Sequence, residues 1–170
     1  MAQGLGASVK QQLDIIAQKL ANTVKKAFNA TFMREVGDET ARLIFIRTRL
    51  GYGVPSQGSQ RQKLFPLSAG YIAMRKKSQK NGFLSSATTV SKSNLTFTGQ
   101  LLESIQTKRA QDGISWVGPV GYRKEGGTNE QVANTVSKTR PFMFLSDLEL
   151  KKIQRFAQNN FSSVFKTRFT

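Results

Sequence analysis

The side chains that most often carry out catalysis are missing from this sequence. The chain has 170 residues and contains neither histidine nor cysteine. Their lack excludes disulfides, thiol nucleophiles, His-assisted triads, imidazole bases and most zinc sites. Ten Asp and Glu residues remain, and their spacing places no two of them on one helical face beside a cleft. We therefore expect no enzymatic activity, no metal site and no cofactor.

The sequence is strongly basic, and its charge is unevenly distributed. There are 26 Lys and Arg residues against ten Asp and Glu, which gives a formal net charge of +16. Residues 41–102 contain ten basic residues and no acidic one, and the last twenty residues add five more basic side chains. Such an excess predicts a polyanionic partner, or an acidic protein neighbour that neutralises it.

Seven basic residues of the central segment are the candidates for lining a DNA channel or docking on a partner protein. They are Arg61, Lys63, Arg75, Lys76, Lys77, Lys80 and Lys92. Charge alone would let them follow a phosphate backbone, whereas the alternative is a solvated loop that keeps the protein in solution. Aromatic residues do not alternate with them, so a stacking platform for single-stranded nucleic acid is not expected.

These residues must be positioned by a fold whose long helices lie near the two ends of the chain. Apolar residues recur every three or four positions from about Ser8 to Phe32, which predicts an amphipathic helix. Asp38 is the predicted N-cap of a second helix over 39–50, although the apolar run 43–46 is also compatible with a strand. Ser146-Asp147-Leu148-Glu149 matches a capping box and predicts a closing helix to about residue 165.

Strands are predicted between these helices. Asp112-Gly113 lies between the strand-like runs 104–109 and 114–118, which is a strong hairpin signal. Residues 142–145 are apolar and are predicted to form a buried strand, with Phe142 and Phe144 both directed into the core. Shorter helices are expected over 71–77 and 129–136. The sequence thus predicts an α+β fold in which a small, mostly antiparallel sheet with a β-hairpin is packed by the long terminal helices.

We expect one domain over residues 1–170, with two extended basic loops or arms at 51–63 and 78–94. The first is punctuated by Gly and Pro, and the second is rich in Ser, Thr and Lys and contains few large apolar groups. The chain also contains 12 Phe residues. Five of them are assigned to the core or to a contact between subunits: Phe142, Phe144, Phe156, Phe161 and Phe165.

Three short blocks, taken in order, resemble a known family. The first block is a Thr-Gly-x-Leu-x-x-Ser-Ile sequence at 98–105, the second is Tyr122 followed by Gly-Thr at 127–128, and the third is Arg-Pro-Phe at 140–142. The order is similar to that of the tail-completion (virion morphogenesis, neck) proteins of tailed bacteriophages. The motif residues carried over are Thr98, Gly99, Leu101, Ser104, Ile105, Arg140 and Pro141. Gly126 departs from the family, which usually has His or Phe before the Gly-Thr pair.

The resemblance implies a structural virion protein without catalytic activity. It would be a ring-forming head–tail connector or tail-completion subunit that surrounds the DNA channel between portal or adaptor proteins and the tail tube or terminator. It would be made in the host cytoplasm and would not contact a membrane, and the basic segment would touch packaged double-stranded DNA non-specifically or dock on a neighbouring protein. The alternative is a small basic nucleic-acid-binding protein of the ribosomal or chromatin type.

Overall fold

The computed structural model describes residues 14, 17, 18, 21, 22, 24, 27–82, 90–93, 95, 99–124 and 126–169, with side chains up to residue 161 in the last helix. The elements are α2 (Ala30–Arg49), β1 (Tyr52–Gly53), β2 (Gln62–Lys63), α3 (Ala69–Lys80), α4 (Gln100–Glu103), β3 (Ile105–Gln111), β4 (Ile114–Pro119), α5 (Asn129–Ser137) and α6 (Asp147–Phe169). Helices combined with two small antiparallel sheets make this an α+β fold, as the sequence predicts.

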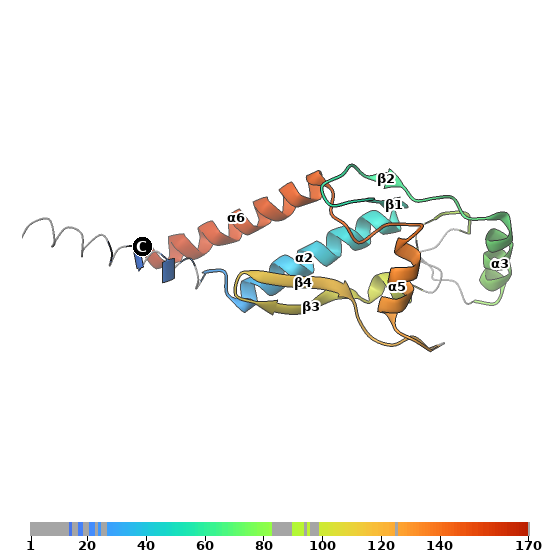
Figure 1. Cartoon of the computed structure of the whole chain (residues 1–170), viewed down its shortest axis with the longest axis horizontal. Coiled ribbons are helices and arrows are strands. Elements are labelled where there is room, and N and C mark those ends of the chain that lie inside the picture. Colours follow the sequence, from blue (N-terminus) through green and yellow to red (C-terminus); the bar gives the residue numbers. More distant parts are fainter. Residues whose placement is uncertain are drawn as a thin grey trace, which may run out of the picture.

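Helix α2 is the central element, and the other long elements pack on it. Figure 1 shows α2 between α6 on one side and the β3–β4 hairpin on the other, with α3 at the far end of the molecule. The main core cluster lies where α2 meets α4, α5 and the start of β3. Its buried members are Ala41, Ile44, Leu101, Leu102, Ile105, Ala133 and Phe142.

The start of α2 differs from the prediction. Asn29 is the N-cap, and its side chain accepts a hydrogen bond from the backbone N–H of Phe32 at 2.9 Å. Asp38 therefore lies inside the helix and is not its cap, and residues 43–46 are helical rather than a strand. The described residues between 14 and 27 are also helical. Residues 28 and 29 are not helical and separate them from α2, so the predicted helix does not continue to Phe32.

Gly37 lies inside α2 because the hairpin approaches the helix closely at this point. A Cβ atom at Gly37 would lie 2.3 Å from Ser115 Oγ and 2.4 Å from Thr107 Oγ1. The Thr107 hydroxyl donates a hydrogen bond of 2.6 Å to Asp38 Oδ1. The local sequence around Gly37 suggests that a helix ends there. The structure shows instead that this glycine allows α2 and the hairpin, which are distant in sequence, to approach each other closely.

The predicted hairpin is confirmed. Strands β3 and β4 pair antiparallel from Ile105↔Pro119 to Gln111↔Ile114, with an irregularity between Thr107 and Arg109. Gly113 has φ +77° in the turn, a conformation that glycine adopts without strain. Its N–H donates to the carbonyl of Phe28 at 2.8 Å, which fastens the turn of the hairpin to the start of α2.

Residues 142–145 do not form the predicted strand. The N–H of Val54 donates to Pro141 O at 3.1 Å, and the N–H of Gly58 donates to Leu145 O at 2.8 Å. These bonds hold an extended segment at its two ends without a continuous ladder. Phe142 is fully buried, whereas Phe144 is 45% exposed, so the two rings do not enter the core together.

The predicted loop regions contain more regular structure than the sequence suggests. Residues 51–63 include the short antiparallel pair β1–β2, in which Tyr52 lies opposite Lys63. Helix α3 is longer than predicted and takes up residues 78–80 of the second loop, while residues 83–89 and 94 lie outside the described residues. Helix α5 agrees with its prediction and begins with a capping box between Thr128 and Gln131.

Candidate functional site

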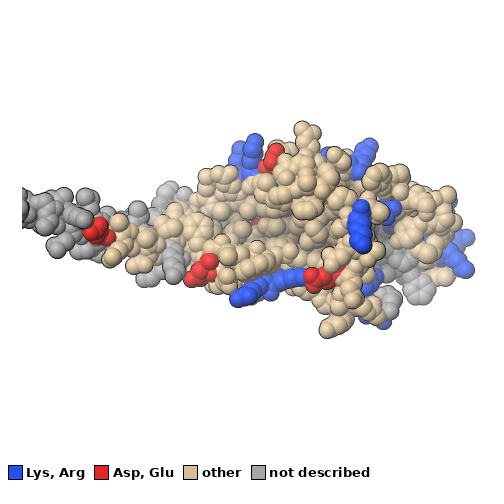
Figure 2. All heavy atoms as spheres, in the orientation of Figure 1, with Lys and Arg blue, Asp and Glu red and all other residues tan. Residues whose placement is uncertain are grey.

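Helix α3 carries most of the predicted basic site. Ser68 is its N-cap and accepts a hydrogen bond from the N–H of Tyr71. Lys76, Lys77 and Lys80 are exposed. Lys80 lies four residues after Lys76 and three after Lys77, which places it beside both on one side of the helix. Figure 2 shows Lys and Arg side chains at the end of the molecule where α3 lies, with no Asp or Glu beside them in this view.

Lys63 and Lys92 extend this surface toward the β1–β2 pair. Both are exposed, and both line the same shallow hollow with Tyr52 and Leu64. The backbone carbonyl of Lys92 accepts a hydrogen bond of 2.9 Å from Nη1 of Arg75 on α3, which ties the two parts together. We call Lys63, Lys76, Lys77, Lys80 and Lys92 the basic surface.

The other two predicted residues do not belong to the basic surface. Arg75 is buried, with 2% of its surface exposed, so it cannot meet a DNA backbone as the sequence suggested. Arg61 Nη2 lies 3.6 Å from Glu149 Oε1, so its charge is partly offset by a carboxylate that is far away in sequence and that also pairs with Arg47. The alternative of a solvated loop is wrong for four of the seven, because Arg75, Lys76, Lys77 and Lys80 are on α3.

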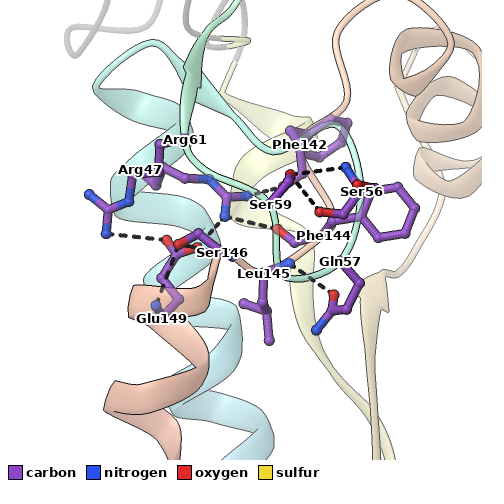
Figure 3. Close-up of polar contacts among 10 residues, drawn as sticks. All are labelled: Arg47, Ser56, Gln57, Ser59, Arg61, Phe142, Phe144, Leu145, Ser146 and Glu149. Atoms are coloured by element: carbon purple, nitrogen blue, oxygen red, sulfur yellow. Dashed lines mark hydrogen bonds and ion pairs between the residues drawn. The ribbon is translucent and has the colours of Figure 1, made fainter.

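A buried ion pair joins α2 to the start of α6. Arg47 Nη1 lies 2.6 Å from Glu149 Oε2, and both side chains are almost completely buried. Arg47 also donates to the backbone carbonyls of Phe142 and of Phe144, the latter at 2.9 Å. Figure 3 shows Arg47 reaching from α2 to Glu149, with Arg61 approaching the same carboxylate.

The Glu149 carboxylate is also the partner of the helix cap. Its Oε2 accepts hydrogen bonds from the Ser146 N–H at 2.9 Å and from the Ser146 hydroxyl at 2.8 Å, and the Glu149 N–H donates to Ser146 Oγ at 3.4 Å. The predicted capping box is thus confirmed. Burial lowers the pKa of Arg47, and the Glu149 carboxylate opposes that shift. Removing one partner would leave a buried charge uncompensated, which is costly.

The predicted interface phenylalanines have different surroundings. Phe142 belongs to the core, Phe144 is exposed, and Phe156 is half-buried. The ring of Phe161 packs on that of Phe28 with 5.3 Å between centroids, which joins α6 to the start of α2. The side chain of Phe165 lies outside the described residues.

The outer face of the β3–β4 hairpin is a surface that the sequence analysis missed. Thr107 and Ser115 face α2, while Ile114 and Trp116 on the opposite face are 46% and 40% exposed. The guanidinium of Arg109 lies 5.3 Å from the centre of the Trp116 ring. Within the described part of the chain, β3 and β4 pair only with each other, which leaves both edges of the ribbon open. The alternation of apolar and polar side chains over residues 114–116 of β4 was the sequence signal that could have identified this face.

Leu101, Ser104 and Ile105 of the family-like motif are buried and are part of the core. Gly99 has φ +81° as the N-cap of α4. The Ser104 hydroxyl donates to Leu101 O at 2.8 Å. Arg140 approaches the carbonyls of residues 65 and 66 at 3.5 Å each, and Pro141 O binds the N–H of residue 54. Thr98 lies outside the described residues.

No group of three or more acidic residues suited to hold a metal ion is present among the described residues. In the same part of the chain, no helix combines the length and the apolar character needed to cross a membrane. The sequence matches no protein-family model and no curated protein, and the fold matches no solved structure.

Proposed function

We propose that this protein is a non-enzymatic structural subunit of a bacteriophage neck, and that copies of it form a ring around the DNA channel. The observation that carries the proposal is the β3–β4 ribbon, whose two edges pair with no other strand among the described residues and whose outer face exposes Ile114 and Trp116. Open strand edges are the usual sites at which another chain adds a strand.

A neighbouring copy is the partner that this ribbon fits best. Trp116 provides a rigid aromatic surface, and Arg109 beside it provides a charged rim, a combination that is common at the centre of protein interfaces. A repeated contact of this kind between different faces of successive copies closes into a ring when the rotation between copies permits it.

The basic surface gives the ring a contact with DNA. Three of its lysines are on α3, which lies at the other end of the molecule from the hairpin turn (Figure 1), and Lys63 and Lys92 line the hollow beside the β1–β2 pair. In a ring, every copy would present the same lysines, and their charges would form a positive collar that attracts phosphates without reading sequence. Binding by each copy would be weak, so that DNA can still pass.

Light scattering on the purified chain, at several protein concentrations, tests this proposal. We expect assemblies of defined mass whose population falls strongly in the variant Trp116→Asp, which places a charge on the outer face of the ribbon. The matched control is Phe65→Ser, since Phe65 is 68% exposed and lies away from the ribbon. If both variants assemble like the parent, or if the parent is monomeric with and without duplex DNA at every concentration, the ribbon is not a ring contact.

The basic surface also supports the second candidate, a nucleic-acid-binding protein of the ribosomal or chromatin type. That function requires tight binding by the monomer, with a logarithmic salt dependence of slope roughly −0.9 for each phosphate neutralised. Fluorescence anisotropy with a short labelled duplex separates the two. The neck proposal predicts weak binding by the monomer, whereas the second candidate predicts strong binding that is unaffected by Trp116→Asp.

A further inference from the structure

A cavity of about 740 Å³ lies between α3, α4 and α5 and is open to solvent. Its size falls within the range of about 300–1,000 Å³ that is common for ligand pockets. The apolar part of its lining includes Leu67, Leu95, Leu101, Val132 and Val136. Three arginines also line it, Arg75, Arg123 and Arg140, and none of the described lining residues is acidic. An apolar cavity with this many guanidinium groups favours an anionic ligand with an apolar body.

Arg75 is the most unusual of the three arginines because it is buried without a counter-charge. Its Nη1 donates to Lys92 O, but Nε and Nη2 have no hydrogen-bond partner among the described residues and are covered from solvent. Burial lowers the pKa of Arg75. The guanidinium also lies 5.9 Å from the centre of the Tyr71 ring, but no described carboxylate compensates its charge. A buried charge of this kind is unfavourable, and a carboxylate held in the cavity would reduce that cost through its charge.

Arg140 can make the direct contact that the covered atoms of Arg75 cannot. It is half-buried, and its Nε and Nη2 lie 3.5 Å from the carbonyl oxygens of Phe65 and Pro66. Hydrogen bonds of that length are weak, so little is lost when they are exchanged for a carboxylate, which a guanidinium binds with two parallel hydrogen bonds. Arg123, whose Nη1 lies 3.4 Å from Asn129 Oδ1, adds positive charge to the same cavity.

We propose that this cavity binds a segment of a partner polypeptide in which a carboxylate side chain stands next to bulky apolar side chains. The carboxylate would lie between Arg140 and Arg75, and the apolar side chains would contact the leucine and valine walls. Phe65, which is 68% exposed, stands beside the lining residue Pro66 and offers further apolar surface to an extended peptide. This site is separate from the β3–β4 ribbon, and the proposal does not depend on ring formation.

The test uses the full-length chain and a yeast-displayed library of random octapeptides, sorted at physiological salt. We expect the enriched peptides to contain Asp or Glu beside Leu, Ile or Phe. Enriched peptides are then synthesised, and their dissociation constants are measured by fluorescence anisotropy. Arg75→Met and Arg140→Gln should each weaken binding by roughly tenfold or more, and replacing the acidic residue of the peptide with its amide should have a similar effect.

Lys76→Gln is the matched control, because it removes one positive charge from the same helix at an exposed residue that does not line the cavity. It should change the affinity by less than about twofold, since exposed charges contribute little. Thermal melts show whether Arg75→Met or Arg140→Gln fails to fold. If one of them does, the affinity of the other variant tests the proposal.

Three results would overturn the proposal. One is a selection without enrichment of acidic-apolar peptides. Another is equal weakening by Lys76→Gln and by Arg75→Met and Arg140→Gln, which would indicate attraction to the whole basic surface. The third concerns free decanoate, tested by calorimetry. If it binds with the same dependence on Arg75 and Arg140 while no peptide is enriched, the ligand is a free apolar acid.

Discussion

Replacing Glu149 with Gln tests how strongly the buried ion pair holds α6 to the rest of the fold. The change keeps the size of the side chain and most of its hydrogen-bonding capacity, but it leaves Arg47 charged and buried with 1% of its side chain exposed. Breaking a buried pair by removing one partner costs about 3–5 kcal/mol. A domain of this size has a total stability of about 5–15 kcal/mol, so the loss is a large part of it.

The assay is urea unfolding followed by circular dichroism, together with thermal melts. For a chain of 150–250 residues, each 1 kcal/mol shifts Tm by about 2–4 °C, so Glu149→Gln should lower Tm by roughly 6–20 °C. The double variant Arg47→Met, Glu149→Leu removes both charges and should lose much less, because no buried charge is left without a partner.

The surface pair formed by Glu39 and Arg42 provides the matched control. Arg42 Nε lies 2.6 Å from Glu39 Oε2, and the Arg42 side chain is 57% exposed. An exposed pair contributes about 0–1 kcal/mol, so Glu39→Gln should leave stability nearly unchanged. If Glu149→Gln costs no more than Glu39→Gln, the pair does not hold α6 in place and our account of this region is refuted.

Three further substitutions test the packing of α2 and α6 by thermal and urea unfolding. Gly37→Ala should destabilise by about 1–3 kcal/mol, because its Cβ would overlap Ser115 Oγ; a neutral effect would show that the hairpin can move away from α2. Ser146→Ala should cost about 1 kcal/mol through loss of the cap, and an unchanged Tm would place the helix start elsewhere. Phe161→Ala should cost less than the ~3–5 kcal/mol of a fully buried Phe, because its ring is half-buried against Phe28; a loss above that range would show that it is more deeply packed.

The parts of the fold that depend on neighbouring residues were predictable from the sequence. The capping box Ser146–Glu149 and the Asp112-Gly113 turn each involve residues within three or four positions of one another, and both are confirmed. The predicted start of α2 was wrong because a glycine at position 37 is typical of a helix boundary. Its glycine is explained by contact with Ser115, which is distant in sequence, and no local pattern contains that information.

The candidate site was less predictable, because charges are compensated across the fold. Residues 41–102 contain no acidic residue, yet Arg61 and Arg47 both meet Glu149, which is about 90 to 100 positions away in sequence. Arg75 also counted as an accessible charge in the sequence, although helix α3 directs it inward. The exposed lysines of the same helix could be identified from composition because nothing in the fold covers them.

Electron cryo-microscopy of the assembled protein tests the central claim most directly, since it shows the order of the subunits and the direction that each surface faces. Our account predicts a closed ring in which Trp116 of each copy is buried against its neighbour and Lys76, Lys77 and Lys80 face the central channel. A particle in which Trp116 is exposed to solvent and these lysines lie on the outer surface would contradict it.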